Sequence, residues 1–216
     1  EFVAQHPDHT VISYVNTTAA TKAVTDIVVT SSNARQIVES LPQDTPIIFG
    51  PDRNLGGYIN SITGRNMLLW DGACHVHEKF SVEKIIELKN QYPEAKVLVH
   101  PECKGAVVKL ADKVGSTAAL LQYSIKDSAN VFIVATESGI LHEMQKACPE
   151  KTFIPAPPSD STCACNECSY MKLLTMQKLY DCLLNESPEI HVDAEVAEKA
   201  ILPINRMLEI SEKLGL

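Results

Sequence analysis

Three cysteines lie within six residues of one another in the last third of the chain. Cys163, Cys165 and Cys168 follow a Pro-rich segment at 155–158 and precede a helix expected over 170–184. Thiolates this dense, in a chain expected to be cytoplasmic, favour metal or redox chemistry over structural disulfides. One hypothesis is therefore a local zinc-binding or thiol-switch module made from these three cysteines.

The elements that must position such a site follow a regular order. Short apolar and β-branched runs alternate with amphipathic stretches, which predicts an α/β fold of parallel strands with right-handed crossovers. We expect two small Rossmann-like domains, at 1–93 and 94–216, the second ending in a helical tail broken at Pro203. Strands are expected at 10–15, 27–30, 46–49, 67–70, 96–99, 131–135 and 152–154. Helices are expected at 17–24, 33–41, 82–91, 103–114, 117–121, 139–147 and 170–184, with a short one after the 50–57 loop.

The two halves match in spacing as well as in element order. Ser31 lies 17 positions after Tyr14, and Thr117 lies 17 positions after His100. Each half continues with a strand, a Gly-bearing loop into a helix, another strand and a cysteine. Such internal repetition indicates pseudo-symmetric copies of one unit.

The repeat makes Cys74 the counterpart of Cys168, so both thiolates could point to one centre. Cys168 at the start of a helix would be favoured as a thiolate by free N–H groups and the helix dipole. Two thiolates do not complete a metal site, but a third copy of the repeat upstream of Glu1 would supply a third. Three cysteines on a four-iron cluster leave one iron open as a Lewis acid. Cys74 could instead be a lone core cysteine. Small buried hydrophobes are expected at Cys103, Cys148 and Cys182.

Polar side chains follow the same strand ends, where parallel sheets place their functional loops. Glu102 could be a general base, His100 a proton carrier or anion partner, and Tyr14 an acid. The alternative for all three is hydrogen bonding to loop backbone. His75 and His77 flank Cys74, and either could bind metal or substrate, although a lone His near a loop is more often solvated.

Two pairs of hydroxyl residues open expected helices. Ser31-Ser32 and Ser116-Thr117 could bind phosphate or carboxylate through hydroxyls and free N–H groups, although N-capping alone is the simpler interpretation. Asp52, Arg53 and Asn54 are expected to form a turn with a surface ion pair. A non-catalytic binding domain for small anions is therefore a further hypothesis.

Composition narrows the classes of function. The net charge of −8 argues against a nucleic-acid partner, which usually meets a basic face. No apolar run approaches the roughly 20 residues that span a membrane. Seven cysteines, an odd number, fit a reducing compartment. The first residues look like a helix end, so we expect the sequence to begin in mid-protein.

Several of these segments together resemble quinolinate synthase, the iron–sulfur enzyme of NAD biosynthesis. The matching segments lie at 14–16, 30–34, 50–56, 100–103, 115–117, 135–140 and 163–171. The resemblance implies three similar α/β domains around a pseudo-threefold axis, each giving one cysteine to a 4Fe–4S cluster. Cys74 and Cys168 would be two ligands, and the third would lie in an upstream domain absent from this chain. The family usually has proline where this chain has Ser169, a change that should be tolerated.

The resemblance also implies a reaction. Iminoaspartate and dihydroxyacetone phosphate would condense to quinolinate with loss of phosphate and water, and an enzyme that oxidises aspartate could be a partner. Glu102, His100 and Tyr14 would move protons. This fragment alone would be inactive. Substrate contacts are implied for Tyr14, Val15, Asn16, Ser31, His77, His100, Pro101, Glu102 and Thr117.

Overall fold

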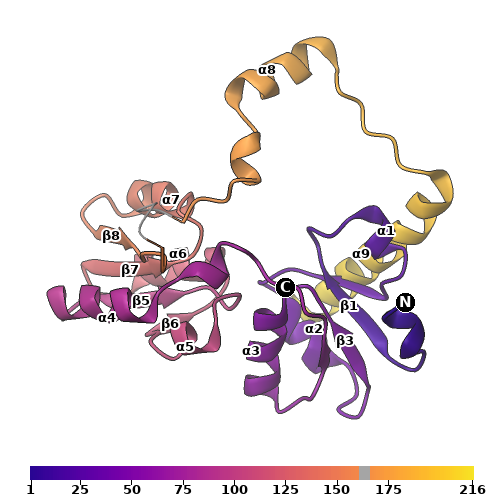
Figure 1. Ribbon diagram of the computed structural model, residues 1–216, viewed down its shortest axis with the longest axis horizontal. Coiled ribbons are helices and arrows are strands. Elements are labelled where there is room, and N and C mark those ends of the chain that lie inside the picture. Colours follow the sequence, from indigo (N-terminus) through magenta and orange to yellow (C-terminus); the bar gives the residue numbers. More distant parts are fainter. Residues whose placement is uncertain (161–165) are drawn as a thin grey trace.

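Two parallel four-stranded sheets form the body of the chain, in a computed structural model that describes residues 1–160 and 166–216. The strand orders, β2-β1-β3-β4 and β6-β5-β7-β8, are the same when each sheet is numbered from its own first strand. Figure 1 shows the two units side by side. The predicted α/β fold with a repeated parallel sheet is confirmed. Cys163 and Cys165, and the zinc or thiol-switch role expected of them, lie outside the described residues.

The first unit is built on short buried strands. Its elements are η1 (Val3–Gln5), β1 (Thr10–Tyr14), α1 (Ala19–Lys22), β2 (Ile27–Val29), α2 (Ala34–Ser40), β3 (Ile47–Phe49), α3 (Arg53–Thr63) and β4 (Leu68–Leu69). Ile12, Val28 and Phe49 are fully buried, as expected for parallel strands covered on both faces. Every strand pair is parallel, so the strands end at one edge of the sheet.

The second unit repeats this plan with two layers of helices. Its elements are η2 (His77–Lys79), α4 (Val82–Gln91), β5 (Lys96–Val99), α5 (Gly105–Val108), β6 (Lys113–Val114), α6 (Thr117–Lys126), β7 (Val131–Ala135), α7 (Ile140–Ala147) and β8 (Thr152–Pro155). One apolar cluster contains Ile85 of α4 and Val107 of α5. The other contains Leu120 of α6 and Met144 of α7. The sheet is therefore covered on both faces.

The helix expected over 103–114 is wrong in its second half. Only residues 105–108 are helical, and Lys113 and Val114 form β6, which pairs with Leu98 and Val99 of β5. Sheet pairing with a distant segment overrides the local helical pattern here, as tertiary contacts often do. The helix after β6 also runs further than expected, to Lys126 rather than 121.

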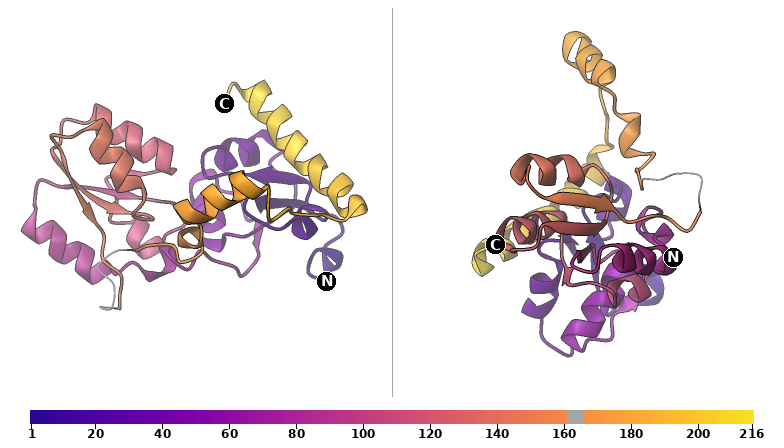
Figure 2. Two further views of the ribbon diagram at one scale, coloured as in Figure 1. Left: turned by 90° about the horizontal axis from the view of Figure 1, so that it is seen from above. Right: turned by 90° about the vertical axis from the view of Figure 1, so that its left-hand side faces the viewer.

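The carboxyl-terminal part crosses from the second unit back to the first. After η3 (Met171–Leu173), α8 (Met176–Asn185) stands away from both sheets (Figures 1 and 2), and α9 (Ala194–Leu214) packs against α1, β2 and α2. The break expected at Pro203 is wrong, because α9 is one continuous helix with Pro203 inside it. Burial of Ala200, Pro203 and Met207 against the first unit offsets the backbone hydrogen bond that proline removes. Among the described residues, no helix is long and apolar enough to cross a membrane.

Helix α3 meets the first sheet at Gly56. A Cβ atom at Gly56 would lie 2.6 Å from Leu69 Cδ2 and 2.9 Å from Phe49 Cδ1, whereas one at Gly57 would lie 3.9 Å from Leu69 Cδ1. We expect Gly56→Ala to lower the free energy of unfolding by about 1–3 kcal/mol through overpacking. The matched change Gly57→Ala should raise it by up to about 1 kcal/mol, since alanine favours a helix interior. Urea denaturation of both variants measures the difference, and equal effects would contradict the close packing of Gly56.

Candidate functional site

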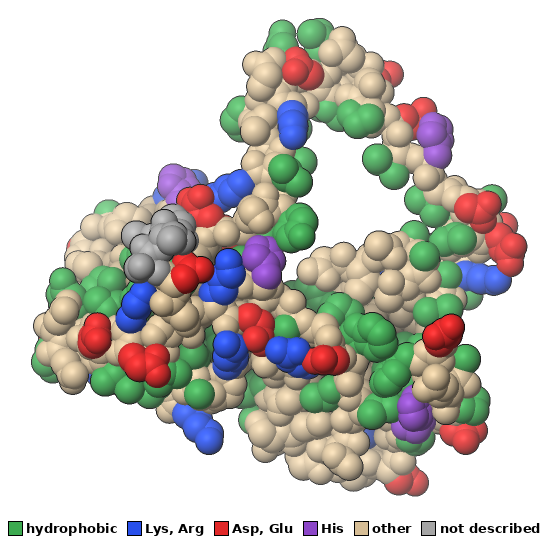
Figure 3. Space-filling view, viewed as in Figure 1, with side chains coloured by type: hydrophobic (Ala, Val, Ile, Leu, Met, Phe, Trp, Pro, Cys, Tyr) green, Lys and Arg blue, Asp and Glu red, His purple; other side chains and the backbone are tan. Residues whose placement is uncertain are grey.

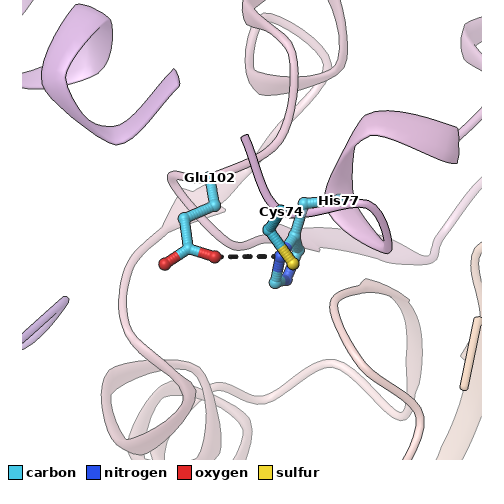
Figure 4. A group of neighbouring side chains, drawn as sticks. All are labelled: Cys74, His77 and Glu102. Carbon is cyan, nitrogen blue, oxygen red and sulfur yellow. Dashed lines mark ion pairs between the residues drawn. The ribbon is translucent and has the colours of Figure 1, made fainter. Parts of the chain in front are cut away.

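Three potential metal ligands converge where the two units meet. Cys74 and His77 lie between β4 and α4, and Glu102 follows β5. Their ligand atoms all lie within 4.8 Å of one another (Figure 4). His77 and Glu102 are buried, and Cys74 is partly exposed. The linker between the sheets thus brings a thiol from one unit to a carboxylate of the other.

His77 is the central member of this group. Its Nδ1 atom lies 3.1 Å from Glu102 Oε2, and its Nε2 atom lies 3.1 Å from Thr136 Oγ1. The ring of His100 stacks on it with 4.6 Å between centroids. Nδ1 has no well-aligned hydrogen bond among the described residues, so its contact with Glu102 is an ion pair only. A buried nitrogen without an aligned partner is a group that a ligand could satisfy.

Burial and charge set the protonation of the cluster. Burial would lower the pKa of His77, but Cys74 and Glu102 together raise it to about 9. Burial and the neighbouring His77 charge lower the pKa of His100 to about 4. Burial would raise the pKa of Glu102, but His77 and His100 hold it below its ordinary value. At neutral pH the group therefore contains an imidazolium, a neutral imidazole and a carboxylate.

The neutral His100 has a defined proton position. Its Nδ1 atom accepts a hydrogen bond of 3.4 Å from the backbone N–H of Glu102. A neutral imidazole that accepts at one nitrogen carries its proton on the other. The Nε2 atom of His100 is therefore the donor.

Tyr14 extends the cluster into the first unit. It ends β1, hydrogen-bonds to Ser31, and lies close enough to Glu102 and Cys74 to sense their charge. Burial raises the pKa of Tyr14 despite the Ser31 hydrogen bond, and the charge of Glu102 raises it further. The phenol is therefore protonated at neutral pH and can donate.

Asp52 is a residue whose importance the sequence did not reveal. It was expected in a turn with a surface ion pair, but it is only 4% exposed. Its Oδ1 atom accepts from the N–H groups of Asn54 and Leu55 at the start of α3, and Oδ2 accepts from the N–H of Cys74 at 2.6 Å. Burial raises its pKa, although these N–H groups oppose the rise. The surface ion pairs belong to Arg53, which contacts Asp71 and Glu78.

These contacts make Asp52 a test of how the Cys74 loop is fixed. Asp52→Ala should lower the free energy of unfolding by about 2–4 kcal/mol, because it removes the helix cap and the bond to Cys74. Asp52→Asn should cost less, since an amide oxygen still caps α3 but an NH₂ group would face the Cys74 N–H. Urea denaturation gives both values. Equal losses in the two variants would show that the cap contributes little.

A cavity of about 190 Å³ separates α2 and α3 of the first unit from the start of α6 in the second. Hydroxyl groups of both units line it, from Ser31, Ser32 and Ser116, and Pro101 forms part of the wall. Thr117, the neighbour of Ser116, is exposed, as are Val15 and Asn16 beyond the end of β1. The structure thus brings Ser31 and Ser116 to one cavity. A second cavity, of about 200 Å³ around Arg65 and Asp44, lies at the opposite end of the first sheet.

Cys168 lies on a separate loop that reaches the Cys74 loop. It is partly exposed and free, and it is not a member of the Cys74, His77 and Glu102 group. The ring of Tyr170 meets His75 edge-on, with 5.3 Å between centroids. The two loops therefore touch through these neighbours.

The other described cysteines differ in their exposure to solvent. Cys103 and Cys148 are buried, as expected, and burial raises the pKa of Cys103 well above its ordinary value. Cys182 was also expected to be buried, but it is exposed on α8, against which the described part of the chain places no sheet. Thr136, which contacts His77, was not among the residues predicted for the site, although it lies in the matching segment 135–140. Its position at the same sheet edge was the available signal.

Known proteins resemble almost the whole of this chain. The family model described as Quinolinate synthetase A protein matches residues 1–209. The chain is 58% identical over 210 residues to a quinolinate synthase of Microcystis aeruginosa, covering 97% of this chain and 66% of the relative. It is 55% identical to that of Thermosynechococcus vestitus, with the same coverage. It is 54% identical over 211 residues to that of Chloroherpeton thalassium, covering 98% of this chain and 66% of the relative. It thus spans slightly less than two thirds of the length of these relatives, and it belongs to the quinolinate synthetase A protein family.

Proposed function

We propose that this chain is part of a quinolinate synthase, which condenses iminoaspartate with dihydroxyacetone phosphate to quinolinate in NAD biosynthesis. Membership of the family supports the activity. One observation connects this activity to particular residues. The ligand atoms of Cys74, His77 and Glu102 lie within 4.8 Å of one another where the two units meet. The remaining third of the relatives' length is needed to complete the enzyme.

The residues present fit a 4Fe–4S cluster. Cys74 and Cys168 are free, partly exposed thiols on touching loops, whereas Cys103 is buried and kept as a thiol. Each thiolate of a cluster binds a different iron, so Cys168 need not join the close Cys74 group. Cys74 and Cys168 would hold the cluster with a cysteine from outside this chain. When bound, it supplies an open iron that acts as a Lewis acid on substrate oxygen or nitrogen.

Three side chains would move protons around the substrate. Glu102, kept ionised beside His77, would take a proton from a substrate carbon. His100 would donate from Nε2 to an oxygen of the substrate or of a leaving group, and Tyr14 would act as an acid from the first unit. Burial of these groups strengthens each interaction, because little water screens it.

The hydroxyl-lined cavity would hold the anionic groups of the substrates. Ser31 and Ser116 face it from the two units, and α6 begins beside it with Thr117. A helix start with free N–H groups favours carboxylate or phosphate. Val15, Asn16 and Pro101 would complete the walls around the substrates.

An exposed apolar surface of this chain would bind the part of the protein that corresponds to the remaining third of the relatives' length. The arm, residues 166–193, exposes large apolar side chains; Leu174 is 83% exposed and Leu183 is 74% exposed. Figure 3 shows hydrophobic side chains along the arm, which borders an opening between it and the body. Exposed apolar surface of this extent marks an interaction site. We assign it to a further unit formed by the unmatched part of the relatives' length, which is similar in size to each unit here.

Anaerobic reconstitution tests the proposal. The protein at the full length of its relatives, given iron and sulfide, should show broad visible absorbance and form quinolinate from the two substrates. This chain alone should form none, and protease should cut its arm more rapidly than in the longer protein. A longer protein that binds an iron–sulfur cluster but makes no quinolinate, or that binds only zinc, would refute the proposal.

A further inference from the structure

We propose that the turn at 136–139, after β7, positions the two thiol-bearing loops relative to each other, with Glu137 as the residue that orients Cys168. The inference rests on the proposed function only in taking Cys74 and Cys168 as ligands of one cluster. Glu137 has no part in the chemistry described above. It acts through its contacts with the Cys168 loop.

Glu137 ties the start of α7 to the Cys168 loop. Its Oε1 atom accepts a hydrogen bond of 3.3 Å from the backbone N–H of Cys168, and Oε2 accepts one of 2.7 Å from Gly139. Next to it, the N–H of Ser138 donates to the backbone oxygen of Asn166 at 3.2 Å. Two bonds from consecutive residues thus fix the backbone just before and at Cys168. Bonds to a carboxylate are stronger than neutral ones, so Glu137 contributes more of this restraint.

Gly139 allows this arrangement. A Cβ atom at Gly139 would lie 2.7 Å from Glu137 Oε2. A separation that short would force the carboxylate away from its position. The Glu137 and Gly139 pair therefore offers two independent ways to remove the same contact, one by losing the carboxylate and one by displacing it.

Thr136 holds the other loop from the same turn. Its hydroxyl contacts His77 Nε2 at 3.1 Å, and His77 lies in the Cys74 group. The turn follows β7, an inner strand paired with both β5 and β8, so its position is firmly set. One side chain of this turn therefore restrains the Cys74 side of the site, and its neighbour restrains the Cys168 side.

Thiol reactivity in this chain without iron tests the inference. We expect Glu137→Ala and Gly139→Ala to raise the alkylation rate of Cys168 by about tenfold, the scale of a lost charged hydrogen bond, and to leave Cys74 unchanged. Thr136→Val should change the alkylation rate of Cys74 and leave that of Cys168 unchanged. Glu137→Gln should have a smaller effect, because an amide oxygen can still accept. Glu143→Gln, which removes an exposed carboxylate of α7, is the matched control.

Mass spectrometry resolves the rate at each cysteine, and buried Cys148 reports loss of the fold. An unchanged Cys168 rate in both alanine variants, or an equal rise at Cys148, would overturn the positioning role. Iron content after reconstitution at full length gives the second readout, and we expect it to fall in Glu137→Ala but not in Glu143→Gln. If the unaltered protein bound no iron while Cys168 still responded, positioning would stand and the proposed function would fail.

Discussion

Replacing Cys168 by alanine will remove the iron–sulfur cluster from the protein at the full length of its relatives. The proposed cluster has three thiolates for four irons and no spare ligand, so the loss of one should lower iron from about four per protein to near zero. Cys74→Ala should do the same, although its thiol lies in the first unit and Cys168 follows the second sheet. Quinolinate formation should fall below detection in both. Iron and sulfide analysis, with the visible spectrum, measures the effect.

Cys182→Ala is the matched control for these variants. Cys182 is also a free thiol, but it is exposed on α8 and should keep its full iron content when changed. A Cys168→Ala variant that retained all its iron would contradict the assignment of Cys168 as a ligand, and Cys163 or Cys165 would then take that role. A Cys74→Ala variant with full iron would leave the close group around His77 without a metal role.

The fold was largely predictable from the sequence because its strands are buried on both faces. Such strands consist mainly of apolar residues, and 96–99 and 131–135 were predicted with their observed bounds. The two-residue strand β6 carries no such run, and only its pairing with β5 defines it. The continuity of α9 through Pro203 likewise depends on packing against a unit distant in sequence.

The candidate site was predictable in part for a similar reason. Parallel strands end at one edge, so polar residues after several strands could be expected to meet there. Asp52 could not be predicted in this way. In the sequence, an acidic residue before a helix has the same pattern whether it is an exposed partner of Arg53 or a buried cap that also binds the Cys74 N–H. Cys182 was predicted to be buried and is exposed. An amphipathic helix predicts a buried face, but the described residues place nothing against this face of α8.

Changing Glu102 to glutamine should reduce kcat by about 10²–10⁴, the usual contribution of a general base, with a smaller effect on KM. Glutamine has nearly the same shape, so it should keep the packing around the side chain, which is 7% exposed. It removes the negative charge that faces His77 at 3.1 Å, and it cannot accept a proton from the substrate. Steady-state quinolinate formation by the reconstituted full-length protein measures the loss. Glu83→Gln, which removes an exposed carboxylate from the first turn of α4, should leave kcat unchanged.

Iron content decides what a loss of activity in Glu102→Gln means. Glu102 lies within 4.8 Å of the Cys74 ligand atom, so the same variant could fail by losing metal rather than by losing a base. We expect its iron content and visible spectrum to match those of the unaltered protein, because thiolates rather than Glu102 would hold the cluster. Full iron with a large fall in kcat supports the role as base. Loss of iron would instead make Glu102 a ligand, and full activity would show that Glu102 is not the base.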